Sequence, residues 1–265
     1  MSGGRIKGRD GVEVAFRELG EGRPLVLVHG FTCSVAMNWI EPGHAERLAA
    51  LGYRLVLPEL RGHGDSEIPR DAASYPDDIF VDDLLALIEQ LDLRDYDLGG
   101  YSMGARTALR ATVRGATPGR LVVAGMGMGG VVDANGYRND LYRKVFAGFG
   151  SFSPDTREGR MEAFLRRTGA DPQAMAHGLE ASVDTTEAEL ASVSVPTLVV
   201  VGANDSLHRD SADRLAESVA DGRLVVVAGS HNEAAVGSEL GEAIAAFLGP
   251  ASDAGRPVAT KGGVG

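Results

Sequence analysis

The sequence of 265 residues predicts an α/β fold, with a mostly parallel eight-stranded sheet flanked by helices and carrying a helical insertion. Three observations lead to this prediction. Short runs of Val, Leu and Ile alternate with longer segments of helical periodicity, which is typical of β-α-β units. Between residues 132 and 194 the alternation stops and only helical patterns remain. Hydrophobic residues make up 44% of the chain, which is enough to bury a core of this size.

The expected strands follow the chain from its start. Residues 5–19 alternate around Asp10-Gly11, a dipeptide that favours a hairpin and therefore two strands. A weaker and more polar run lies at residues 96–99. The other five are continuous apolar runs of the kind buried on both faces of a parallel sheet, at residues 25–28, 54–57, 121–124, 197–201 and 224–227.

Segments with helical periodicity lie between these runs, and their distribution sets the expected domain boundaries. They are expected at residues 78–91, 103–114, 211–219 and 240–248. The core then comprises residues 1–131 and 195–249, and a helical insertion comprises residues 132–194. Since open α/β sheets bind ligands at the carboxyl ends of their strands, the insertion is predicted to be a lid over that edge. The alternative is a helical layer without a lid role. The Gly- and Ala-rich tail, residues 250–265, is predicted to be disordered.

Charge and cysteine content exclude several classes of function. The 26 basic and 37 acidic residues give a net charge of −11, so neither nucleic acid nor an anionic membrane is an expected partner. The single cysteine, Cys33, excludes a disulfide framework and a thiolate metal cluster, and no metal-ligand spacing is present. We find no secretory signal and no apolar run of about 18 residues. A cytoplasmic protein acting on a small molecule is predicted, without metal or cofactor and with its oligomeric state open.

Residues 100–104 match G-x-S-x-G between an expected strand and an expected helix. At a sharp strand-to-helix turn, the residues two before and two after the serine must lack side chains for the turn to close. The turn would expose the Ser102 hydroxyl and place the Met103 N–H at a helix N-terminus, where it can stabilise developing negative charge. The alternative is that Ser102 only caps the helix.

A serine nucleophile needs a base, and the base needs an orienting carboxylate. Asp205 and His231 each follow an apolar run, which places them at the same sheet edge as Ser102. The chain order Ser, Asp, His is that of one hydrolase architecture. We therefore predict Ser102, Asp205 and His231 as catalytic residues. His208 and Cys33 are weaker candidates, because His208 would lie beside Asp205 and Cys33 has no activating base nearby.

These motifs resemble the α/β-hydrolase superfamily, in particular its small lid-bearing esterases, over about residues 5–249. Residues 28–31, Val-His-Gly-Phe, resemble the oxyanion loop of that family, which implies that the N–H groups of Phe31 and Met103 form the oxyanion hole. Residues 61–66 resemble its R-G-H-G-x-S loop, so His29 and His63 are expected to fix loops. Two departures are Glu59, where the family usually has Asp, and the polar strand containing Asp97.

The predicted activity is hydrolysis of a carboxylic ester or lactone of a small, mainly apolar substrate through an acyl-enzyme. Two alternatives stay open: hydrolysis of a carbon–carbon bond or enol-lactone from aromatic degradation, and a small-molecule receptor that keeps the triad. Serine in place of Asp as nucleophile speaks against a dehalogenase or an epoxide hydrolase. An apolar pocket with few fixed charges, favouring neutral esters, is expected from Tyr137, Tyr142 and Phe146 of the insertion and from Met126.

Overall fold

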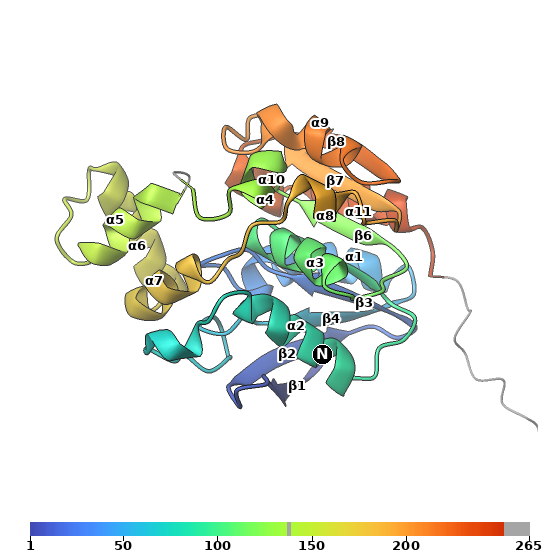
Figure 1. Ribbon diagram of the computed structural model, residues 1–265, viewed down its shortest axis with the longest axis horizontal. Helices are drawn as coiled ribbons and strands as arrows, with labels where there is room; N and C mark the ends of the chain where they lie inside the picture. Colours follow the sequence, from blue (N-terminus) through green and yellow to red (C-terminus); the bar gives the residue numbers. More distant parts are fainter. Residues whose placement is uncertain (137–138, 252–265) are drawn as a thin grey trace, which may run out of the picture.

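The computed structural model describes residues 1–136 and 139–251, and residues 252–265 of the predicted tail lie outside them. Eight strands form one sheet in the order β1-β2-β4-β3-β5-β6-β7-β8 (Figure 1). Strand β2 pairs antiparallel with both β1 and β4, and all other pairs are parallel. The predicted fold class is therefore confirmed. The strands are β1 (Ser2–Lys7), β2 (Glu13–Leu19), β3 (Arg23–Val28), β4 (Tyr53–Pro58), β5 (Asp97–Tyr101), β6 (Leu121–Ala124), β7 (Thr197–Gly202) and β8 (Gly222–Val227).

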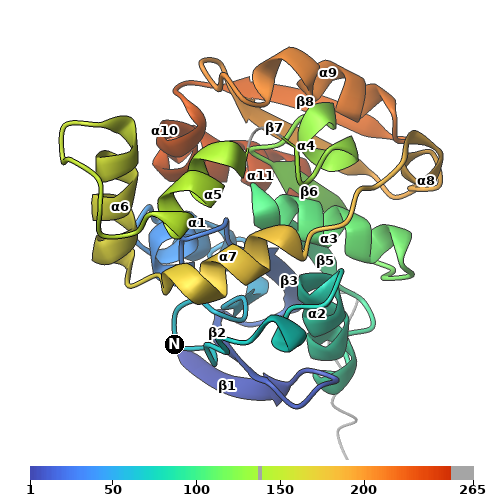
Figure 2. The same cartoon turned by 60° about the vertical axis from the view of Figure 1, so that its left-hand side comes forward.

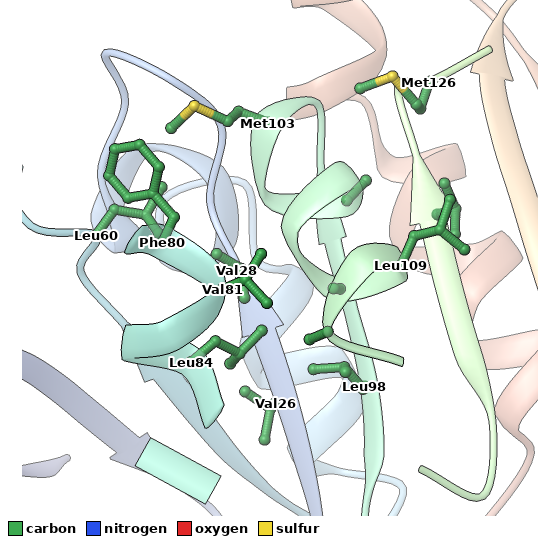
Figure 3. Close-up of a cluster of buried hydrophobic side chains, with 14 of the residues drawn as sticks. Val26, Val28, Leu60, Phe80, Val81, Leu84, Leu98, Met103, Leu109 and Met126 are labelled. Carbon is green, nitrogen blue, oxygen red and sulfur yellow. The ribbon is translucent and has the colours of Figure 1, made fainter. Parts of the chain in front are cut away.

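Helices cover both faces of the sheet, and alternate residues of each strand point to opposite layers. Val26 and Val28 of β3 pack in one hydrophobic cluster with α2 (Ile79–Gln90) and α3 (Met103–Val113) (Figure 3). The same cluster includes residues of α9 (Arg209–Glu217). The intervening Leu25 and Leu27 pack in a second cluster with α1 (His44–Ala49) and α11 (Ser238–Leu248). Burial on both faces explains why this strand is a continuous apolar run.

The polar strand β5 has a structural reason for its aspartate. The Asp97 side chain is fully buried, and its carboxylate forms ion pairs with Arg23 at 3.0 Å and with Arg120 at 2.6 Å. A buried charge is tolerated when it is paired and hydrogen-bonded in this way. The departure from an apolar run is thus compensated by two arginines that lie far away in the sequence.

Between β6 and β7 the described chain is helical, as predicted. Three of its helices, α5, α6 and α7, gather at one side of the molecule, where α5 contacts both others (Figures 1 and 2). Within residues 1–136 and 139–251, no helix combines the length and hydropathy that a bilayer crossing requires. The helices of this segment are α4 (Met128–Val132), α5 (Asp140–Ala147), α6 (Arg157–Thr168), α7 (Pro172–Glu180) and α8 (Glu187–Leu190).

Candidate active site

Ser102 lies at a tight turn between β5 and α3. Its φ of +54° is in the left-handed region, which costs a non-glycine residue on the order of 1–2 kcal/mol. The flanking glycines are required by close packing, since a Cβ on Gly100 would lie 2.4 Å from the Gly104 carbonyl carbon. A Cβ on Gly104 would lie 2.3 Å from the Val28 oxygen. The Ser102 side chain makes no capping hydrogen bond to α3, so the capping alternative is wrong.

The structure brings the three predicted catalytic residues together. His231 Nε2 lies 3.0 Å from Ser102 Oγ, and His231 Nδ1 lies 2.7 Å from Asp205 Oδ2. Asp205 follows β7 as predicted. His231, expected in a loop, is instead the first residue of the short helix α10 (His231–Val236). The sequence did not reveal this helix, because six residues are too few for a recognisable periodicity.

Asp205 is positioned as an ionised acceptor. Its carboxylate is 1% exposed, and its Oδ1 accepts hydrogen bonds from the Leu207 N–H at 3.0 Å and the His208 N–H at 3.2 Å. Burial opposes ionisation, but the contact with His231 and the amide donors outweigh it, so the pKa of Asp205 lies below its ordinary value. An ionised carboxylate accepts a hydrogen bond from the His231 Nδ1–H and so keeps the proton on that nitrogen. The Nε2 lone pair is then directed at the Ser102 hydroxyl.

Tyr101 and His208 also lie next to His231. The Tyr101 hydroxyl donates a hydrogen bond to the His231 carbonyl at 2.6 Å, which ties the start of α10 to the end of β5. His208 lies beside Asp205, as expected, and its ring centroid is 5.2 Å from that of His231. Sequence analysis did not identify Tyr101, although it occupies the variable position before the serine of the G-x-S-x-G motif.

The predicted oxyanion donors adjoin Ser102. Phe31 and Met103 both line the cavity that contains Ser102. Among the described residues, none accepts a backbone hydrogen bond from the Phe31 or the Met103 N–H, so both donors are available to an anion. The loop around Phe31 is held on both sides. Asn38 Oδ1 accepts from the Gly30 N–H at 2.8 Å, and His63 Nε2 accepts from the Thr32 N–H at 3.0 Å.

His29 and His63 make the loop contacts that the resemblance implied. His29 Nε2 accepts a hydrogen bond from the Leu60 N–H at 3.0 Å. His63 Nδ1 lies 3.0 Å from the Arg61 carbonyl, to which it donates while Nε2 accepts. Burial, with a smaller effect of neighbouring His29, lowers the pKa of His63 to about 3. A neutral ring is what the acceptor role toward the Thr32 N–H requires.

This buried neutral histidine predicts an acid-sensitive fold. Between about pH 6.5 and pH 3 the unfolded chain protonates His63 while the native protein does not, so stability is full above pH 6.5 and falls as pH decreases. His63→Gln keeps an acceptor for the Thr32 N–H but cannot protonate. We expect its free energy of unfolding to depend less on pH, by up to about 1.4 kcal/mol per unit below pH 6.5. Urea unfolding of both proteins between pH 7.5 and 4.5 measures this; parallel curves would contradict it.

A cavity of about 470 Å³ opens onto Ser102 and His231. Of the residues predicted to bind substrate, Tyr142 and Met126 line it, and Tyr137 lies outside the described residues. The prediction for Phe146 is wrong. Its side chain is 9% exposed and packs in the core, with its ring 5.9 Å from Tyr142 and 6.1 Å from Phe31.

The cavity also contains more fixed charge than the few charged groups predicted from the sequence. Arg106 of α3, Arg157 and Arg160 of α6, and Asp133 are among its lining residues. Met161 and Phe164 of α6 supply apolar surface beside them. Arg106 could have been predicted from the sequence as a cavity residue, because a residue four positions after Ser102 lies on the same face of the helix. The cavity is therefore amphipathic.

Comparisons with known proteins agree with this architecture. The model of the alpha/beta hydrolase family matches residues 25–246. The chain is 30% identical to the non-heme chloroperoxidase CPO-A1 of Kitasatospora aureofaciens over 231 residues, which are 75% of this chain and 80% of that protein. An esterase from Exiguobacterium antarcticum superimposes with a TM-score of 0.75 at 22% identity, covering 94% and 99% of the two chains. An enol-lactonase from Burkholderia xenovorans LB400 gives a TM-score of 0.71 at 22% identity, covering 92% and 99%. At these identities the two solved structures show the fold alone.

Proposed function

The chain belongs to the alpha/beta hydrolase family, and we propose that within it the protein is a serine hydrolase that cleaves a carboxylic ester or lactone of a small substrate. The observation that carries the proposal is the continuous contact from Asp205 through His231 to Ser102, at 2.7 and 3.0 Å. It is the arrangement that activates a serine hydroxyl, which is otherwise a weak nucleophile at neutral pH.

In the proposed reaction, Ser102 Oγ attacks the substrate carbonyl carbon while His231 Nε2 accepts its proton. Asp205 stabilises the imidazolium that forms, and the N–H groups of Phe31 and Met103 bind the oxyanion. Collapse of the tetrahedral intermediate breaks the ester bond, and His231 returns the proton to the leaving alcohol. A water molecule, deprotonated by His231, then attacks the acyl-enzyme and releases the acid and free Ser102.

Epoxide opening is a poor fit to this site for a chemical reason. Attack of a serine hydroxyl on an epoxide carbon gives an ether, which water does not hydrolyse, whereas a carboxylate nucleophile gives a cleavable ester. Hydrolysis of an enol-lactone is compatible, because an enol-lactone is an acyl ester that passes through the same intermediate. The enol-lactonase alternative is therefore a special case of the proposed reaction.

The segment of residues 132–194 is proposed to act as the lid of this site. It contributes Leu141 and Tyr142 from α5, and Met161 and Phe164 from α6, to the lining of the cavity that contains Ser102. An aromatic and aliphatic cover of this kind excludes water from the reacting ester, which strengthens the electrostatic contribution of the oxyanion donors.

Covalent labelling combined with turnover tests the proposal. A fluorophosphonate should modify Ser102 and no other residue, and 4-nitrophenyl esters should be hydrolysed with saturable kinetics. Burial raises the pKa of the Cys33 thiol to about 11, so that side chain stays protonated and should not compete for the probe. Labelling at Cys33, or no labelling, would contradict the proposed nucleophile. Labelling of Ser102 with negligible turnover would instead favour the receptor alternative.

A further inference from the structure

Arg106 is a cation inside the catalytic cavity that is bound only by neutral groups. Its guanidinium donates to the Ala134 carbonyl at 3.0 Å and to Ser182 Oγ at 2.7 Å, with a longer contact of 3.4 Å to the Gly130 carbonyl. Over the described residues, no carboxylate forms an ion pair with it. Burial lowers the pKa of Arg106 to about 10, which leaves it protonated at neutral pH. Asp184 stabilises this charge only from beyond ion-pair distance, so the cavity contains a positive charge with no described carboxylate in contact with it.

Other arginines of low exposure in this chain are neutralised by carboxylates. Arg61 is fully buried, and it pairs with both Asp10 and Asp83 at 2.7 Å. Arg110 pairs with Asp78, also at 2.7 Å. Arg106 differs from these arginines, because it is half-buried at the cavity and no described carboxylate is in contact with its guanidinium. A guanidinium at a substrate cavity that no carboxylate contacts can bind an anionic ligand directly.

One face of α6 extends this positive charge to the cavity mouth. Its lining residues, Arg157, Arg160, Met161 and Phe164, are spaced i, i+3, i+4 and i+7, which places them on one side of the helix. Arg157 and Arg160 are exposed, and neither forms an ion pair with a described residue. The same helix face thus presents cations and apolar groups to the cavity, in a chain whose net charge is −11.

We propose that the cavity recognises a carboxylate on its substrate, so that the protein acts on esters or lactones that carry a free acid group. This inference rests on the proposed serine hydrolase function. Arg106 binds the carboxylate by charge-assisted hydrogen bonds, and Arg157 and Arg160 attract it at the mouth. Met161 and Phe164 contact the apolar part of the substrate. The mainly apolar, neutral substrate expected from the sequence is replaced by an amphipathic one.

The position of Arg106 on α3 relates the carboxylate site to the nucleophile. Arg106 lies one helical turn after Ser102, and both residues line the same cavity, so a substrate can reach both at once only if its carboxylate and its ester group lie close together.

Two matched substrates test the inference. In 4-nitrophenyl hydrogen adipate, a carboxylate replaces the terminal methyl group of 4-nitrophenyl hexanoate, and nothing else differs. We expect the wild type to show the higher kcat/KM for the adipate. The adipate-to-hexanoate ratio of kcat/KM should fall about 10- to 100-fold in Arg106→Gln, because this variant loses the charge-assisted hydrogen bond to the carboxylate of the adipate ester. The double variant Arg157→Gln/Arg160→Gln should lower the ratio less, with the loss shrinking at high salt.

Arg9→Gln is the matched control, because Arg9 is exposed, lies outside the cavity and forms no ion pair with a described residue. Its ratio should equal that of the wild type. Should Arg106→Gln fail to fold, Arg106→Lys keeps the charge but loses the planar fork, and an intermediate ratio is expected. A wild-type preference for the hexanoate, or an unchanged ratio in the folded Arg106 variant, overturns the inference. Faster cleavage of an analogue ending in a phosphate overturns the assignment to a carboxylate.

Binding of adipate itself separates this inference from the proposed function. Adipate should raise the Tm of the wild type and of Arg9→Gln, but not of Arg106→Gln. If Ser102 is labelled and the hexanoate is hydrolysed while adipate produces no Tm shift, the carboxylate site is wrong and the serine hydrolase stands. If neither ester is turned over while the Arg106-dependent shift is present, the proposed reaction is wrong and the anion site stands.

Discussion

Replacing Ser102 by alanine is expected to abolish acyl-enzyme formation and to lower kcat/KM for 4-nitrophenyl esters by roughly 10⁴-fold or more. The hydroxyl is the group that His231 Nε2 contacts at 3.0 Å. Cys33, the only thiol of the chain, is held protonated by burial and cannot take over. Initial-rate kinetics and the mass of the fluorophosphonate adduct measure the effect.

Ser102→Gly supplies the control for backbone strain in the same experiment. Glycine tolerates the φ of +54° that serine and alanine adopt at a cost, so Ser102→Gly should be as inactive as Ser102→Ala but more stable, by about 1 kcal/mol. Equal loss of activity at different stability would show that the hydroxyl, and not the shape of the turn, carries the reaction. Residual activity within tenfold of the wild type in either variant would refute Ser102 as nucleophile.

Asp205→Asn is expected to reduce kcat by about 10⁴-fold, the loss found for the equivalent change in chymotrypsin-type proteases. The asparagine amide would donate to His231 Nδ1, which shifts the proton to Nε2 and turns an N–H toward the Ser102 hydroxyl. The base then has no lone pair for the serine proton. The amide oxygen of asparagine can still accept hydrogen bonds from the Leu207 and His208 N–H groups. We therefore expect this loop to keep its conformation in the variant.

The matched control is Asp210→Asn, which makes the same change of charge on the exposed surface of α9 five residues away. It should retain the wild-type rate, since it removes the charge without touching His231. The pre-steady-state rate of 4-nitrophenol release compares the three proteins. An Asp205→Asn enzyme with nearly the wild-type rate would mean that another carboxylate orients the base.

The sequence predicted the strands and the meeting of the three candidate catalytic residues, because both depend on patterns within short stretches of the chain. Buried strands are short apolar runs whichever partner they pair with, so β3 and β7 were found within a few residues of their observed bounds. Ser102, Asp205 and His231 could be predicted to meet because each follows a strand whose carboxyl end lies at one sheet edge. Their contacts are present in the structure, and the variants above test their roles.

The features that could not be predicted depend on contacts between residues that are far apart in the sequence. Arg23 and Arg120 neutralise Asp97 from 74 and 23 residues away, and no local pattern links them. In the helical insertion, periodicity identifies an apolar face but not what it packs against. Phe146 therefore lies in the core, and the α6 face with Arg157 and Arg160 lines the cavity.

The contact between Gly104 and Val28 has a consequence for redesigning this protein. Strand β3 ends in the loop that carries Phe31, and α3 begins directly after Ser102, so this backbone contact brings the nucleophile and the oxyanion donor close together. With a Cβ at position 104 only 2.3 Å from the Val28 oxygen, even alanine would push the two elements apart. Directed evolution toward new substrates should therefore accept many residues on α6 and none at position 104. In a library that also randomises position 104, every clone that replaces this glycine would be unproductive.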